Sequence, residues 1–135
     1  MHPFRAAVEA ADLGAAVALL AEDVVFESPV VFRPYRGRAA VAPILHAVSQ
    51  VFEDFRYVRE IGAPGAPDHA LVFRTRVGER ELDGVDLLHT REDGAIDRLT
   101  VMVRPLSAAY ALAEAMQARL AADAAPAGAA GPAQP

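Results

Sequence analysis

The chain has 135 residues, of which 53% are hydrophobic, and its 13 basic and 18 acidic side chains leave a net charge of −5. This length fits one domain with a hydrophobic core of its own. The absence of cysteine excludes disulfides, thiolate catalysis and cysteine-ligated zinc, and the acidic balance argues against nucleic acid or an anionic membrane as a partner.

The two ends of the chain set the expected compartment and the domain limits. No apolar run approaches the roughly 20 residues that a membrane-spanning helix needs, and the first residues show no signal-peptide pattern. We therefore expect a cytoplasmic protein without a membrane partner. The segment from Ala121 to Pro135 has no large apolar residue that could offset its ordering entropy. It is predicted to be a flexible tail, which leaves residues 1–120 as a single domain.

The first part of the chain is predicted to be mainly helical. Pro3 suits a first helical turn, and Asp12 suits the N-cap of a second helix. A proline deep inside a helix would remove a backbone hydrogen bond, so Pro43 is expected in the first turn of a third helix. The predicted elements are a helix beginning near Pro3, a helix over 13–21, a strand over 24–28 that ends at Pro29, and a helix over 38–51.

From Phe55 onward the hydrophobic period changes to two, which is typical of strands. Asp93-Gly94 is a hairpin signal between the last two strands. Four antiparallel strands are predicted over 55–61, 71–77, 82–90 and 96–103, followed by a helix over 106–120. A run of helices followed by a run of strands indicates the α+β class, with the sheet packed on the helices.

The last two strands are apolar on both of their faces, unlike a half-solvated strand, which alternates. A second copy of the chain is the simplest cover for the second face. We therefore expect a homodimer through the sheet face, burying Val85, Leu87 and Met102. The charged residues of that face could pair across the dimer; they are Arg74, Arg76, Asp83 and Arg104.

Asp86 is the most informative polar residue, because it interrupts an otherwise apolar strand face shared with Leu82, Gly84 and Leu88. Burial of a carboxylate among apolar groups raises its pKa. Asp86 is therefore a candidate catalytic residue, as an acid or base near neutral pH or as a hydrogen-bond donor to an oxyanion. The alternative interpretation is structural, with Asp86 paired to an arginine or capping a backbone group.

Three segments together resemble a known family: AADLGAAVALLAEDVVFESPV (10–30), YRGRAAV (35–41) and VDLLHTREDGAIDRLTVMVRP (85–105). In this order and spacing they are similar to the SnoaL-like branch of the nuclear-transport-factor-two superfamily, over roughly residues 3–106. The resemblance implies a cone-shaped, curved antiparallel sheet wrapped around N-terminal helices, with an internal pocket. The superfamily includes polyketide cyclases, ketosteroid isomerases, epoxide hydrolases, dehydratases and non-catalytic domains, so the fold does not imply one function.

Residue by residue, the resemblance carries over only in part. Asp86 falls where similar isomerases have a protonated aspartic acid. Their general-base aspartate falls on Ser28, which cannot abstract a carbon-bound proton, and their oxyanion-hole tyrosine falls on Phe4, which has no donor. Epoxide hydrolases of this fold have an arginine where this chain has Gly84. The steroid-isomerase and epoxide-hydrolase mechanisms are therefore not expected in their usual form.

A small apolar molecule is the expected partner of the internal pocket. Tyr57 is distinctive there, because a buried phenol needs a hydrogen-bond partner. No histidine pair has metal-ligand spacing and no phosphate-binding loop is present, so neither a metal nor a cofactor is expected. The residues predicted to contact the ligand are Phe4, Phe26, Ser28, Leu45, Phe52, Tyr57, Phe73, Leu88 and Val101.

Three hypotheses for function follow. The favoured one is a small-molecule-binding domain with an apolar pocket. The second is an isomerase or cyclase of a carbonyl compound that uses Asp86 as acid, base or oxyanion donor. The third is a non-catalytic dimeric interaction module in which core side chains fill the pocket. A cavity of a few hundred Å³ that includes Asp86 would favour the first two.

Overall fold

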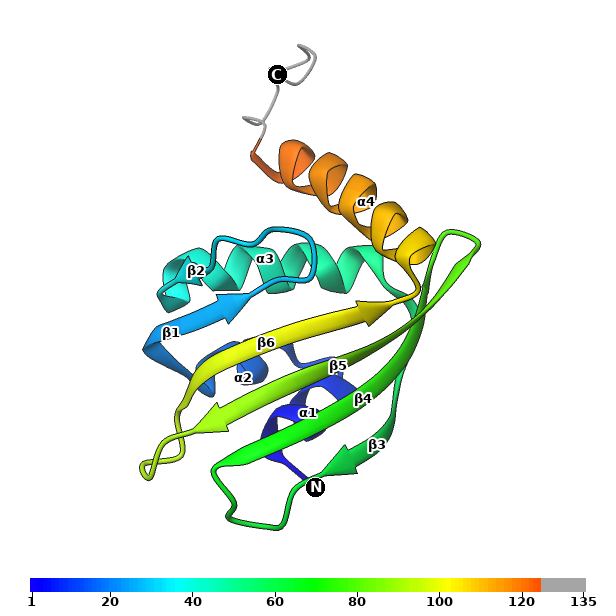
Figure 1. Ribbon diagram of the computed structural model, residues 1–135. Helices are drawn as coiled ribbons and strands as arrows, with labels where there is room; N and C mark the ends of the chain where they lie inside the picture. Colours follow the sequence, from blue (N-terminus) through cyan, green and yellow to red (C-terminus); the bar gives the residue numbers. More distant parts are fainter. Residues whose placement is uncertain (125–135) are drawn as a thin grey trace.

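A computed structural model describes residues 1–124 of the chain. Helices cover one face of a curved six-stranded sheet, and α4 turns back after β6 to lie against α3 (Figure 1). The elements are α1 (Pro3–Glu9), α2 (Leu13–Ala18), β1 (Leu20–Glu27), β2 (Tyr35–Arg36), α3 (Arg38–Val51), β3 (Glu53–Ile61), β4 (Asp68–Val77), β5 (Arg80–Thr90), β6 (Ile96–Arg104) and α4 (Leu106–Ala124). The α+β class and the cone are as predicted.

The sheet is mixed rather than antiparallel throughout, which corrects the prediction. Its strand order is β2-β1-β6-β5-β4-β3. The four strands β3 to β6 are antiparallel neighbours, as predicted, but β1 runs parallel to β6. The physical reason is that no hairpin joins β1 to β6. The chain between them passes through β2, α3 and the strands β3 to β5, and so long a crossover allows parallel pairing.

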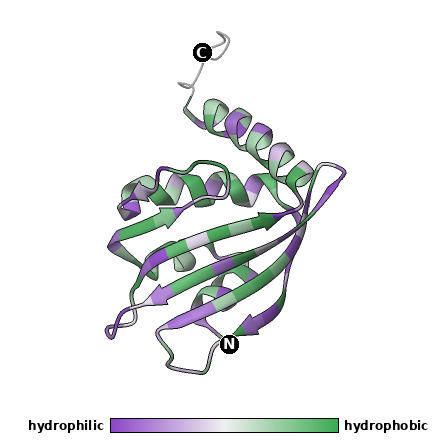
Figure 2. Cartoon of the chain, in the orientation of Figure 1, coloured by the Kyte–Doolittle hydropathy of each residue, from purple (hydrophilic) through white to green (hydrophobic). Residues whose placement is uncertain are grey.

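Strand alternation separates the core from the outer face (Figure 2). Leu71 and Phe73 on β4 are at most 1% exposed, and Leu88 on β5 is 2% exposed. On the opposite face, Leu87 and Met102 are 37% and 54% exposed. Burial of the inner row against the helices is the main source of stability, at about 25 cal/mol per Å² of apolar surface.

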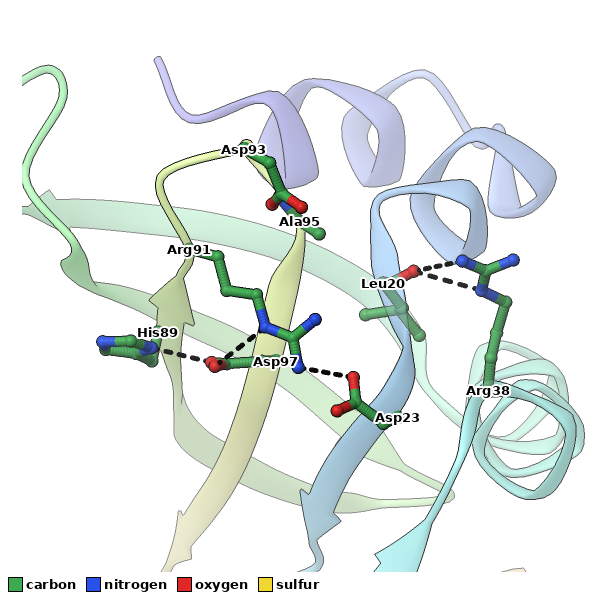
Figure 3. A network of polar contacts seen from close by, with 8 residues as sticks. All are labelled: Leu20, Asp23, Arg38, His89, Arg91, Asp93, Ala95 and Asp97. Carbon is green, nitrogen blue, oxygen red and sulfur yellow. Dashed lines mark hydrogen bonds and ion pairs between the residues drawn. The ribbon is translucent and has the colours of Figure 1, made fainter.

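Two features of the helical region differ from the prediction. The second helix ends at Ala18 rather than residue 21, because Leu20 already pairs with Ile96 of β6 and begins β1. Pro43 lies inside α3 beyond its first turn, although the helix spans the predicted residues. The N-terminus of α3 is instead anchored from outside, because the Arg38 guanidinium donates two hydrogen bonds, of 3.1 and 2.7 Å, to the Leu20 carbonyl (Figure 3).

The outer-face charges pair within the chain. Asp83 contacts Arg74 at 3.4 Å and Arg104 at 2.9 Å, and Arg76 contacts Asp54 at 2.8 Å. These are solvent-exposed pairs, which typically contribute about 0–1 kcal/mol each. Pairing across a dimer, which was expected from the sequence, is therefore not required to explain why these charged side chains lie on the outer face.

The C-terminal helix is longer than predicted, since α4 continues through Ala124 into the segment expected to be a tail. The rest of that predicted tail, residues 125–135, lies outside the described residues. Among residues 1–124, no helix combines the length and the hydrophobicity that crossing a membrane requires.

Candidate functional site

A cavity of about 1070 Å³ lies between the inner face of the sheet and the helices. Its wall is mainly apolar and includes side chains from all four helices, for example Val8, Leu13, Ile44 and Met116. Polar side chains also reach it, among them Asp86 on β5, which comes from the sheet side. The cavity is therefore an apolar space with a few polar groups at separate places on its wall.

Most residues predicted to contact a ligand line this cavity. They are Phe4, Phe26, Ser28, Leu45, Phe52, Tyr57 and Val101. Phe73 and Leu88 do not, because both are buried in the core behind the cavity wall. The Phe73 ring packs beneath Phe52 and Phe55, with ring centroids 5.6 and 4.9 Å away. Phe73 therefore shapes the wall without forming it.

Asp86 is 8% exposed and hydrogen-bonds to one side chain, Tyr57, whose phenol donates to Asp86 Oδ2 at 2.7 Å. Among the described residues, no arginine forms an ion pair with Asp86. Its two immediate cross-strand partners, Leu71 and Val101, are apolar. The second carboxyl oxygen, Oδ1, has no hydrogen-bond partner within residues 1–124 and is the atom left to meet a molecule in the cavity.

Burial determines the protonation of this pair. It raises the pKa of the Asp86 carboxyl to about 7, although the hydrogen bond from Tyr57 acts in the opposite direction. Burial, and after it the charge of Asp86, also raises the pKa of Tyr57, so the phenol keeps its proton. Near neutral pH, Asp86 can therefore both hold and release a proton, while Tyr57 acts only as a donor.

Ser28 has a local structural role in addition to lining the cavity. Its Oγ accepts hydrogen bonds from the backbone N–H groups of Val30 and Val31, each at 3.1 Å. These bonds shape the segment that follows β1, and Val30 and Val31 also line the cavity. The hydroxyl hydrogen of Ser28 remains for another acceptor, but a serine hydroxyl supplies no base at neutral pH.

Phe4 enters the cavity from α1, which polar contacts hold at the sheet. The His2 ring caps α1, because its Nδ1 accepts from the Phe4 backbone N–H at 3.0 Å. The His2 backbone N–H donates to Glu60 of β3 at 3.0 Å, and Arg5 lies 3.5 Å from the same carboxylate. Arg5 also lies over the Tyr57 ring, 5.9 Å from its centroid. Helix α1 thus contacts Tyr57, the residue that hydrogen-bonds to Asp86, through Arg5.

Helix α4 supplies wall residues that were not among the predicted ligand contacts: Leu112, Met116 and Leu120 line the cavity. The helical spacing of these residues was visible in the sequence, but the surface they face was not. Glu9, Asp12 and Arg56 also reach the cavity and are exposed, so they lie where it opens.

A separate polar network lies at the end of the sheet where β5 turns into β6 (Figure 3). Asp97 accepts from His89 Nδ1 at 2.7 Å and from Arg91 at 3.3 Å, and Arg91 also pairs with Asp23 on β1. These side chains satisfy one another and hold three strands together. Across residues 1–124, no group of three or more histidine or acidic side chains is arranged to hold a metal ion.

Comparison with solved structures identifies the fold. An NTF2-like protein from Burkholderia xenovorans LB400 is 23% identical, with a TM-score of 0.60 over 84% of this chain and 90% of that chain. At this identity the likeness shows the fold alone. The mixed sheet wrapped around helices is thus an NTF2-like α+β cone.

The family is shown by sequence. The model of the SnoaL-like domain matches residues 2–99, so this chain belongs to the SnoaL-like domain family, as its motifs predicted. A steroid delta-isomerase from Pseudomonas aeruginosa is 42% identical, with a TM-score of 0.83 over 87% of this chain and 86% of that chain. A bacterial protein with a cystatin-like fold from Silicibacter pomeroyi DSS-3 is 41% identical, with a TM-score of 0.81 over 88% and 86%. A search of curated proteins finds no match.

Proposed function

We propose that the cavity binds a flat, largely apolar carbonyl compound and that protonated Asp86 donates a hydrogen bond to its carbonyl oxygen. The observation that carries the proposal is a buried carboxyl group at an apolar wall with one oxygen already occupied by Tyr57. The free Oδ1 is then the one strong donor position on that part of the wall. The neighbouring rings of Phe52 and Phe55, stacked at 5.8 Å, suit a flat ligand.

The protonation of Asp86 sets which ligand is preferred. Below a pKa of about 7 the carboxyl is neutral and donates, which suits a ketone or aldehyde oxygen. Above that pH the carboxylate only accepts, which suits a hydroxyl group. A ketone and the alcohol of the same carbon skeleton should therefore bind with opposite pH dependence.

This pair of ligands provides the test. We would titrate the protein with 2-acetylnaphthalene and with 1-(2-naphthyl)ethanol, following fluorescence, at pH 6 and pH 8.5. The ketone should bind more tightly at pH 6 and the alcohol at pH 8.5. Asp86→Asn keeps an N–H donor, so its ketone affinity should stay within about tenfold, or roughly 1.4 kcal/mol, and become independent of pH. Asp83→Asn is the matched control, because Asp83 lies on the outer face. An unchanged pH dependence in Asp86→Asn would rule the proposal out.

A second candidate is an isomerase or cyclase of a carbonyl compound, and one observation favours it. The Pseudomonas aeruginosa structure that is 42% identical to this chain is named a steroid delta-isomerase. In such a reaction Asp86 would protonate or stabilise an enolate. The proton-abstracting base would have to be a residue other than Ser28, whose Oγ already accepts two backbone hydrogen bonds. Conversion of a β,γ-unsaturated ketone, followed by the absorbance of the conjugated product and lost in Asp86→Asn, would establish catalysis.

The third candidate, a module whose cone is filled by core side chains, is disfavoured by the size of the cavity. Dimerisation is a separate question. We propose that the outer face binds a second copy through Val85, Leu87 and Met102. The support is an exposed apolar centre bordered by Asp83 with its arginine partners, and such a mixture of both charge signs suits a self-complementary contact.

A further inference from the structure

Gly84 sits at the centre of the inner sheet face, next to Asp86, and it is the residue whose missing side chain most affects the site. A Cβ atom built on Gly84 would lie 2.7 Å from both Cε atoms of Phe73 and closer still to its Cζ. The backbone of Gly84 does not lie in the left-handed region, so alanine would be allowed there by conformation. Glycine is therefore required because the end of the Phe73 ring occupies the space that a side chain at position 84 would need.

The register of the sheet explains why this matters for Asp86. Tyr57 pairs with Phe73, and Phe73 pairs with Gly84, so the three lie in one row across β3, β4 and β5. Asp86 lies one inward-facing position further along β5, opposite Leu71. To donate its 2.7 Å hydrogen bond, Tyr57 must reach diagonally across β4, past Phe73. The Phe73 ring leaves that route open because it leans over Gly84.

We propose that Gly84 is a positioning residue of the site. Because it has no side chain, the Phe73 ring can lie against β5, and this leaves room for Tyr57 to reach across β4 and hydrogen-bond to Asp86. A methyl group at position 84 would push the ring back toward Tyr57, whose ring centroid is 6.4 Å away, and toward Phe55 at 4.9 Å. Both neighbours line the cavity. The consequence for ligand binding rests on the proposed function, but the effect on the Tyr57–Asp86 contact does not.

The test uses the ligand-free protein first. The carboxyl carbon of Asp86 is titrated by NMR in the wild type, in Gly84→Ala and in Gly84→Ala/Phe73→Leu, where the smaller leucine makes room for the added methyl group. Loss of the Tyr57 hydrogen bond removes an interaction that lowers the Asp86 titration midpoint, so Gly84→Ala should raise that midpoint by at least half a pH unit. The double variant should restore it. Gly14→Ala is the control, since a Cβ there meets only an ordinary 3.6 Å contact.

Two further measurements separate a positioning role from a merely structural one. Gly84→Ala should cause no additional change in the Asp86 midpoint when Tyr57→Phe is already present. In the wild type, a nuclear Overhauser effect should connect the Gly84 Hα atoms to the end of the Phe73 ring, which tests the geometry even if Gly84→Ala does not fold. A folded Gly84→Ala with an unchanged midpoint, or a missing Overhauser effect, would overturn the proposal.

Ligand binding is measured last, with 2-acetylnaphthalene as the probe. If the Asp86 midpoint moves as expected and ketone affinity falls at least fivefold at pH 5.5, where Asp86 is mainly protonated in both proteins, the positioning role and the proposed function are both supported. If the midpoint moves while ketone affinity does not, the positioning role is supported and the proposed function fails. The two ideas can therefore fail separately.

Discussion

The phenol of Tyr57 on β3 donates a 2.7 Å hydrogen bond to Asp86 on β5, across the intervening strand β4. This contact joins two side chains that are 29 residues apart in the chain. It occupies one carboxyl oxygen and leaves the other at the wall of an apolar cavity. The protonation of Asp86 is thus set by burial and by one neutral donor, with no cation in its ion-pair range among the described residues.

The first prediction concerns the pH dependence of stability. Because the pKa of Asp86 is raised in the folded protein, its stabilising contribution is present at low pH and is lost as pH rises toward about 7. At about 1.4 kcal/mol per pH unit, this loss is about 3 kcal/mol between pH 5 and pH 8. Asp86→Asn has no titrating carboxyl at this position, so it does not lose this stability. The free energy of unfolding of the variant, relative to that of the wild type, should therefore be about 3 kcal/mol more favourable at pH 8 than at pH 5. Urea unfolding of both proteins at pH 5 and pH 8 measures the difference. Asp83→Asn, with an exposed carboxylate, should show no such gain.

The second prediction concerns the phenol of Tyr57. Tyr57→Phe removes the hydrogen bond that lowers the Asp86 pKa, so this pKa should rise above its wild-type value. The lost hydrogen bond should lower the free energy of unfolding by about 1 kcal/mol. NMR titration of the Asp86 carboxyl carbon and urea unfolding measure the two effects. An Asp86 pKa that fell in Tyr57→Phe would contradict the assigned direction of the bond.

The third prediction concerns the cap of α1. The pKa of His2 is lowered by burial and by His69, whose ring lies 4.8 Å away, while Glu60 acts in the opposite direction. Its stabilising contribution is therefore present above pH 6.5 and is lost as pH falls, when protonation of Nδ1 would also break the cap. His2→Asn keeps a capping oxygen but does not titrate. Its melting temperature should fall less than that of the wild type between pH 7.5 and pH 5.5, whereas the exposed His46→Asn should behave like the wild type.

The fourth prediction concerns the outer face. Met102→Asp places an unpaired charge in the proposed dimer contact and should lower the association constant at least tenfold. Sedimentation velocity over a range of concentrations measures it. Phe32→Asp is a control that also removes an exposed apolar side chain, but from the segment between β1 and β2. A wild-type mass equal to the monomer at every concentration would rule the dimer out.

Local patterns in the sequence were sufficient for much of the fold. The helix predicted over 38–51 has the observed bounds of α3, because helical periodicity is a property of adjacent turns. The two-residue period of β5 placed Asp86 on the same face as Leu82 and Leu88, which are buried as well. The family was predicted from three short motifs and their order along the chain, and the SnoaL-like domain model confirms it.

Long-range contacts were not available from those patterns. Nothing local indicates that β1 pairs in parallel with β6 or that α4 closes one wall of the cavity. Likewise, a buried tyrosine predicted the need for a partner, but the partner itself depends on the relative register of β3, β4 and β5.

By itself, the sequence determined which face of each element is apolar and that Asp86 interrupts one of these faces, because side-chain period and hydrophobicity are encoded residue by residue. Only the tertiary structure decided that Asp86 meets Tyr57 rather than an arginine, and that Phe73 rests on Gly84 instead of lining the cavity. The reason is that such contacts depend on the alignment of strands distant in the chain, which the packing of the whole core selects.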